Sequence, residues 1–330
     1  MKYLFLVTLL LLFSYENYAQ TTYAEKLGYP KGKKVIIFHI DDAGMSYEAN
    51  QGTIIAMEKG VANSTSVMMP CGWVPAYMKY LQQHPTTDAG VHLTLTSEWK
   101  GYRWFPIAGN EKVPGLLDKE GAMWSNVPDV VKHATADEVE IEIRAQIARF
   151  RSFGVEPSHI DSHMGTLFGS PAFTERYIRV GIQEKIPVML PGGHATLIGK
   201  ERNSPAQEIQ QFQQVGKTLW DAGLPVLDDL FADTYGWKLP TNMPITEENL
   251  RKMKTQKYIE LLKEAKPGIT MVIMHCAAPS DNFKEITDSW PTRYGDFWAM
   301  LDPALKQFIE KEGIILTTWR EMRERRSKVN

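Results

Sequence analysis

The chain has 330 residues, of which 43% are hydrophobic and 23% are charged, and this composition is typical of a globular protein. It carries 37 lysines and arginines against 39 aspartates and glutamates, so its formal net charge is −2. Without a basic excess, we expect neither nucleic acid nor an anionic membrane surface as a partner. The two cysteines, Cys71 and Cys276, do not form a disulfide framework, and we expect two buried thiols.

The N-terminal segment reads "MKYLFLVTLLLLFSYENYAQ". A single lysine precedes an apolar run at residues 3–13, and a polar stretch follows that ends in Ala19 and Gln20. This layout predicts a secretory signal peptide over residues 1–19, because the apolar run is too short to span a bilayer comfortably. An uncleaved N-terminal anchor is the alternative. We therefore expect an exported protein, periplasmic or extracellular, with a single domain at residues 20–330 and no membrane span after signal cleavage.

After this segment, short β-branched runs alternate with longer stretches of helical spacing. Strands are predicted at residues 34–40, 64–69, 90–96, 158–163, 186–190, 224–228, 269–275 and 313–319. Helices are predicted at residues 46–59, 136–153, 171–184, 205–222, 246–265 and 297–312. The alternation predicts an α/β fold with mostly parallel strands, and about eight such units favour a single distorted TIM-like (β/α) barrel. No glycine-rich dinucleotide fingerprint follows the first strand, which counts against a Rossmann fold.

Three long stretches lack a clear helix or strand pattern, and each follows a predicted strand. They cover residues 97–135, 229–244 and 276–296. In a barrel these stretches would meet at the C-terminal face, where active sites are built. They carry Trp99, Trp104, Trp124, Trp237 and Trp290. Such rings either stack on sugars or bury themselves, and Trp99 is the one we assign to a substrate-binding or supporting role.

Polar residues collect at the ends of the predicted strands. They are Asp41 and Asp42 after the first strand, His92 in the third, His159, Asp161 and His163 in the fourth, and His275 in the seventh. One aspartate and two imidazoles form a common ligand set for a catalytic divalent metal, and a second carboxylate can act as general base. Each signal also has a plainer explanation, since paired aspartates occur in turns and strand histidines occur in cores. Their combination on four strands favours the metal site.

The motifs "HIDDAGMS", "GVHLTLTSEW", "HIDSHMG" and "MHC" resemble, in order and spacing, those of the YdjC-like carbohydrate deacetylases. That family includes the chito-oligosaccharide deacetylases. The resemblance covers most of the chain after the predicted signal peptide. It implies a distorted TIM-like barrel, a divalent metal and hydrolysis of an N-acetyl group on a sugar. It also implies that Asp42, His92 and His163 are the metal ligands, that Asp41 is the base, and that His275 is a late histidine able to act as general acid.

The expected function is therefore a metal-dependent hydrolase that removes N-acetyl groups from an amino sugar or oligosaccharide. Asp41 would deprotonate the attacking water, while His159 and Asp161 would orient the ligands. The metal would be magnesium or zinc, because two imidazoles permit zinc and an oxygen-rich remainder permits magnesium. One alternative is a metal-dependent ester or phosphoester hydrolase, although no arginine or lysine cluster lies beside the motifs. Another is a non-catalytic carbohydrate-binding protein on the same fold, which would predict a damaged catalytic set.

Overall fold

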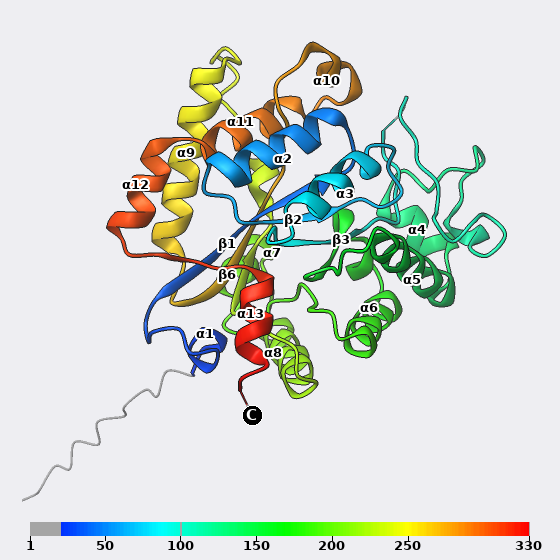
Figure 1. Ribbon diagram of the computed structural model, residues 1–330, viewed down its shortest axis with the longest axis horizontal. Helices are drawn as coiled ribbons and strands as arrows, with labels where there is room; N and C mark the ends of the chain where they lie inside the picture. The colour runs from blue at the N-terminus through cyan, green and yellow to red at the C-terminus, as the bar shows by residue number, and fades with distance from the viewer. Residues whose placement is uncertain (1–20, 100, 330) are drawn as a thin grey trace, which may run out of the picture.

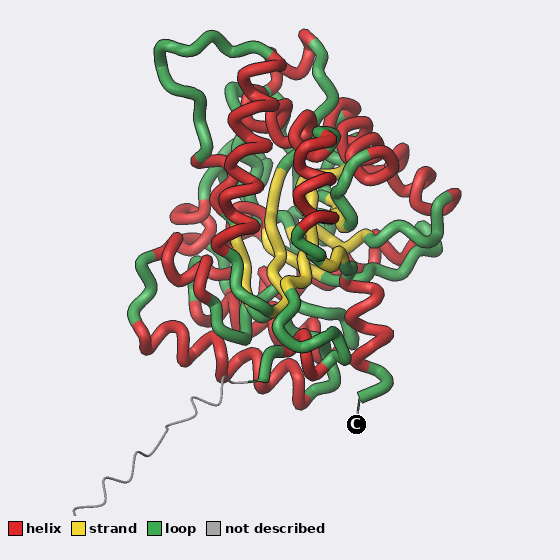
Figure 2. Tube along the Cα trace, turned by 90° about the vertical axis from the view of Figure 1, so that its left-hand side faces the viewer, coloured by secondary structure: helices red, strands yellow, loops and turns green. Residues whose placement is uncertain are grey.

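The computed structural model describes residues 21–99 and 101–329, so the predicted signal peptide at residues 1–19 lies outside the described residues. Parallel strands form the centre of the molecule, and helices surround them (Figure 1). After a turn of 90° the strands are still enclosed by helices (Figure 2). The strands are β1 (Lys34–Ala43), β2 (Ser64–Val67), β3 (Ala89–Leu93), β4 (Ile160–Ser162), β5 (Asp229–Phe231), β6 (Gly268–Met274) and β7 (Ile315–Leu316).

The order of the strands is β4-β3-β2-β1-β6-β5, with β7 pairing beside the first residues of β1. Beyond β4, single bridges join Ile160 to Val188 and Pro191 to Leu227. The N–H of Asp228 then donates to the carbonyl of Ile269 in β6, at 2.9 Å. These contacts link the two ends of the sheet, and they confirm the prediction of a distorted TIM-like barrel with mostly parallel strands.

Some of the predicted strands are shorter than expected. The run at residues 186–190 contributes only the bridge at Val188, and the run at 224–228 contributes a bridge at Leu227 just before β5. Both runs contain a proline, at Pro187 and Pro225, which cannot donate a hydrogen bond to a ladder. The run at 313–319 is reduced to the two residues of β7.

Most of the predicted helices are present, but the one predicted at residues 297–312 is wrong. Two helices occupy that region, because Pro303 cannot continue a helix and Asp302 caps the second one through the N–H of Ala304. Among the described residues, no helix is both long and apolar enough to cross a membrane. The α-helices are α1 (Tyr23–Lys26), α2 (Tyr47–Lys59), α3 (Val74–Gln83), α4 (Val127–His133), α5 (Ala136–Ser152), α6 (Pro171–Glu184), α7 (Thr196–Arg202), α8 (Ala206–Asp221), α9 (Glu247–Glu264), α10 (Asp281–Ile286), α11 (Trp290–Met300), α12 (Pro303–Lys311) and α13 (Trp319–Arg326). The short 3₁₀ helices are η1 (Pro114–Leu116), η2 (His163–Phe168) and η3 (Asp233–Gly236).

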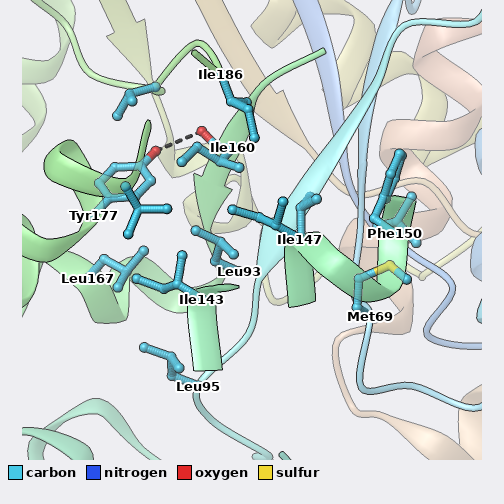
Figure 3. Packing of buried hydrophobic residues seen from close by; sticks show 14 of the residues in the cluster. Met69, Leu93, Leu95, Ile143, Ile147, Phe150, Ile160, Leu167, Tyr177 and Ile186 are labelled. Atoms are coloured by element: carbon cyan, nitrogen blue, oxygen red, sulfur yellow. Dashed lines mark hydrogen bonds between the residues drawn. The ribbon is translucent and has the colours of Figure 1, made fainter. Parts of the chain in front are cut away.

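The hydrophobic core holds the site-bearing strands against the outer helices. Helix α5 places Ile143, Ile147 and Phe150 in one cluster with Leu93 of β3 and Ile160 of β4 (Figure 3). All five are at most 2% exposed, and burying a side chain of this size contributes roughly 1.5–3 kcal/mol. This packing fixes β3 and β4, whose polar residues belong to the site.

Candidate active site

The backbone at the end of β1 brings both aspartates to one cavity. In a regular strand Asp41 and Asp42 would point to opposite faces. Here the pairing with β2 shifts register between Ile40 and Ala43, and Asp42 adopts a left-handed conformation with φ of 70°. As a result, both carboxylates line the same cavity of about 520 Å³. A left-handed non-glycine residue is strained, and such strain occurs often at functional sites.

Asp42, His92 and His163 form a compact group of metal-binding atoms. Oδ1 of Asp42 lies 3.2 Å from Nε2 of His92 and 3.3 Å from Nδ1 of His163, and the two nitrogens are 3.2 Å apart. All three residues are at most 4% exposed, and neither carboxylate oxygen of Asp42 has a hydrogen-bond partner of good geometry. Ligand atoms at these separations could each lie about 2.1 Å from one cation, with angles of about 100° between the bonds to it. The residues therefore fit a divalent metal.

Each imidazole of this group has a carboxylate on its other nitrogen. Nδ1 of His92 lies 2.7 Å from Oδ1 of Asp161, and Nε2 of His163 lies 3.1 Å from Oε2 of Glu98. A proton held on that nitrogen leaves the opposite nitrogen free to bind a metal. Asp161 thus contacts His92 where an orienting residue would lie, and its orienting role stays a prediction. Glu98 was missed, although it stands in the same motif as His92.

A further histidine, His39, connects Asp161 to the predicted base. Nε2 of His39 lies 2.9 Å from Oδ2 of Asp161 and 3.1 Å from Oδ1 of Asp41, and Nδ1 lies 2.9 Å from the Ser64 hydroxyl. Burial alone would lower the pKa of His39, but hydrogen bonds and charge from Asp161 and Asp41 raise this pKa to about 9. His39 is therefore cationic at neutral pH. His39 was not among the site residues predicted from the sequence.

The predicted supporting residue His159 lies further from the cavity. Its ring stacks on Trp319 with centroids 5.1 Å apart, and its Nδ1 contacts the Ser158 hydroxyl at 2.9 Å. Its Nε2 is 3.7 Å from Asp161 and its ring meets that of His39 edge-on with centroids 4.9 Å apart, so His159 reaches the candidate ligands through these two neighbours. His159 does not line the cavity.

Helix α11 contributes a buried arginine that the sequence analysis did not identify. Arg293 is 3% exposed, and its Nη1 lies 2.8 Å from Oδ2 of Asp42. Its guanidinium is placed 5.6 Å from the ring centroid of Trp99 and 5.4 Å from that of Tyr235. Burial would raise the pKa of Asp42, but Arg293 and the two imidazoles hold this pKa well below its usual range. Asp42 is therefore a carboxylate even without a metal.

His275 directly follows β6 and faces both aspartates. Its Nε2 lies 3.8 Å from Oδ2 of Asp41, and its backbone N–H donates to Oδ2 of Asp296 at 3.2 Å. Asp296 is paired with the buried Lys254 at 2.8 Å, which anchors this end of the strand. Burial and the charge of Arg293 outweigh Asp42 and lower the pKa of His275 well below its usual range. His275 is thus neutral at neutral pH.

The tryptophans of the long loops differ in what they contact. Trp99 is 8% exposed and lines the cavity, where it covers Arg293. Trp104 donates to the carbonyl of Thr96 at 2.6 Å, and Trp124 stacks on His133, so both support the loop from within. Among the predicted aromatic residues, Trp99 is the one that lines the cavity, while the Trp104 ring meets that of His163 edge-on with centroids 6.4 Å apart.

Comparison with known proteins finds relatives that match nearly the whole chain. A carbohydrate deacetylase of Thermus thermophilus is 30% identical over 301 residues, which cover 91% of this chain and 97% of that protein. A carbohydrate deacetylase of Thermoanaerobacter pseudethanolicus is 24% identical over 286 residues, covering 87% and 98%. The crystal structure of a candidate cellobiose-phosphate cleavage protein of Enterococcus faecalis V583 shares the fold, with a TM-score of 0.69, 21% identity and coverage of 88% and 99%. The family model described as YdjC-like protein matches residues 35–311, and the chain therefore belongs to the YdjC-like family.

Proposed function

We propose that the protein is a metal-dependent carbohydrate deacetylase that hydrolyses the N-acetyl amide of an amino sugar or oligosaccharide. The observation that carries this proposal is the group of Asp42, His92 and His163, whose ligand atoms lie within 3.3 Å of one another beside Asp41. Two relatives that match over nearly their whole length are carbohydrate deacetylases.

The donor set favours zinc among the divalent ions. When bound at this site, the ion polarises the amide carbonyl and lowers the pKa of water. Two imidazole nitrogens suit zinc, whereas magnesium prefers an octahedron of oxygens. Magnesium is the alternative, and the assay below distinguishes the two.

Asp41 is placed to act as the base. Its Oδ1 is held near His39, while its Oδ2 faces His275 across 3.8 Å, and the residue lines the cavity. Asp41 takes a proton from water as the oxygen attacks the carbonyl carbon. His275 is neutral at rest, so its Nε2 receives this proton from Asp41 and passes it to the leaving nitrogen. The C–N bond breaks, and acetate and the free amine are released.

The test is acetate release from a panel of N-acetylated sugars and acetyl esters. We would compare protein as purified, protein treated with EDTA, and EDTA-treated protein reloaded with zinc or magnesium. Asp41→Asn should lose about 10²–10⁴-fold in rate. Asp281→Asn is the matched control, because the Asp281 side chain is 98% exposed and lies outside the cavity. Amide hydrolysis that persists after metal removal, or after Asp41→Asn, would contradict the proposal.

Export belongs to the proposal as well, on the layout of residues 1–19. Mass spectrometry of protein from the periplasmic or extracellular fraction should find a mature chain beginning at Gln20. Recovery of the full-length chain from the cytoplasm alone would contradict it.

A further inference from the structure

A second cavity adjoins the catalytic one. Its volume is about 730 Å³, and Tyr235 and Ser289 line both cavities. The loop after Tyr235 supplies much of its wall, and Leu250 of α9 closes another side. Two of its lining side chains, Met243 and Ile245, are 41% and 53% exposed. Apolar side chains of this size at the rim of a cavity commonly mark a binding site.

The chemistry of the wall suits an alkyl chain better than a sugar ring. Sugars are bound by converging hydrogen-bonding groups and flat aromatic faces, whereas aliphatic and thioether side chains adapt to flexible apolar groups. Leu239, Met243, Ile245 and Leu250 are of the second kind. Tyr235 and Trp237 also line the cavity, but the Trp237 ring stacks on Phe231 and the Arg293 guanidinium lies over the Tyr235 ring. The lining hydroxyls of Ser289 and Thr292 are hydrogen-bonded within the protein, to Thr287 and Lys254. The charged residues of the lining are Lys238 and Asp288, of opposite sign, so the cavity has no net preference for a charged ligand.

The position of Tyr235 indicates which part of a substrate would reach this cavity. The Tyr235 ring meets His275 edge-on, with centroids 4.3 Å apart. His275 serves the leaving nitrogen in the proposed reaction, so the cavity lies on the side of the sugar and not of the acetyl group. Continuity between the two cavities then makes the occupant a group attached to that sugar.

We infer that the second cavity binds an apolar aglycone, and that the substrate class is N-acetylated amino-sugar glycosides bearing an alkyl or acyl chain. This inference rests on the proposed function for the sugar half of the substrate. The inference that an alkyl or acyl chain is bound depends only on the second cavity, so it can be tested separately from the deacetylase reaction.

The experiment is calorimetric binding of alkyl N-acetylglucosaminides with methyl, butyl, hexyl and octyl chains, below micelle concentrations, to EDTA-treated protein. Each buried methylene is worth about 0.8 kcal/mol, so Kd should fall about fourfold per added methylene until the cavity is filled. Ile245→Asp should abolish this dependence. Ile141→Asp should leave it unchanged, because Ile141 is 41% exposed on α5 and does not line the cavity.

Each outcome decides one proposal. A Kd independent of chain length, or equal effects of the two variants, overturns the apolar aglycone even if acetate is released from the methyl glycoside. If Kd depends on chain length and Ile245→Asp removes this dependence, the apolar aglycone is supported. If acetate is then not released from any of these glycosides, only the deacetylase proposal fails. Met243→Asp provides a second variant if Ile245→Asp does not fold by circular dichroism.

Discussion

Removing the charge of Arg293 should destabilise the metal-free protein far more than the metal-loaded protein. Nη1 of Arg293 lies 2.8 Å from Oδ2 of Asp42, and both side chains are at most 4% exposed. At that separation, with an effective dielectric constant of about 20, the attraction is at most roughly 6 kcal/mol. Desolvation offsets part of it, and breaking one side of a buried pair costs about 3–5 kcal/mol.

The variant Arg293→Met keeps most of the volume and leaves Asp42 without its cation. In metal-free protein we expect a loss of about 3 kcal/mol in the free energy of unfolding, toward the low end of that range because His92 and His163 also face Asp42. A bound dication would offset the same carboxylate, so the loss should shrink to about 1 kcal/mol or less.

Thermal unfolding by circular dichroism, with EDTA and with zinc, measures this difference. Arg144→Met is the control, because Arg144 forms an ion pair with Glu140 while 36% exposed, and exposed pairs contribute at most about 1 kcal/mol. An equal drop in Tm with and without zinc would refute the compensation between Arg293 and the metal. So would a drop no larger than that of Arg144→Met.

Two further variants test one contact of a candidate metal ligand and one carboxyl buried on α5 outside the cavity. Asp161→Asn removes the carboxylate 2.7 Å from Nδ1 of His92, so zinc affinity measured against a chelating dye should fall about 10–100-fold; unchanged affinity would deny Asp161 an orienting role. Glu142 is fully buried, and burial raises its pKa to about 7. The N–H groups of Ile107 and Ala108 donate to its carboxylate and lower this pKa, but burial outweighs them. The folded state therefore holds this proton more tightly than the unfolded state, and up to about 3 kcal/mol of stability is lost as pH rises from 4.5 to 7. In thermal melts at pH 5 and 8, Glu142→Gln should show a smaller decrease in Tm than the unchanged protein, and equal decreases would contradict this assignment.

Local signals in the sequence predicted most of the barrel. Helix α5 has apolar residues at helical spacing and ends before Gly154, whose φ of 74° requires a residue that tolerates the left-handed region. Its predicted limits are within one residue of the observed ones. The run at 186–190 was misjudged as a full strand, because β-branched composition does not show that Pro187 lacks the hydrogen needed for a ladder.

The candidate site was predictable where its residues end parallel strands. Asp41, Asp42, His92 and His163 meet because the carboxyl ends of parallel strands share one face of a barrel. Arg293 could not be found in this way, since it lies on a helix and its contact with Asp42 spans the chain. The left-handed backbone of Asp42 is likewise a tertiary outcome, with no signal in "HIDDAGMS".

The charges around the site lead to a last prediction, on proton release. Four carboxylates, two fixed cations and two ligand imidazoles surround the metal position: Asp41, Asp42, Glu98, Asp161, His39, Arg293, His92 and His163. Burial would lower the pKa of the two ligand imidazoles, but nearby carboxylates raise it, well above its usual value for His92 and to about 9 for His163. The four carboxylates and two cations leave a net charge of about −2. Without a metal, a proton on each of the two ligand imidazoles balances this charge, and a bound dication would balance it in their place.

Zinc binding should therefore release about two protons below pH 9, and the apparent affinity should fall as pH decreases, by up to about 100-fold per pH unit. Calorimetry at pH 7 in buffers of different ionisation enthalpy counts the protons released. His163→Ala should reduce the count by about one, whereas His84→Ala, at an exposed histidine outside the cavity, should not change it. A count near zero for the unchanged protein would mean that the two imidazoles are already neutral. That result would contradict the assignment of two protons to His92 and His163 in the metal-free protein.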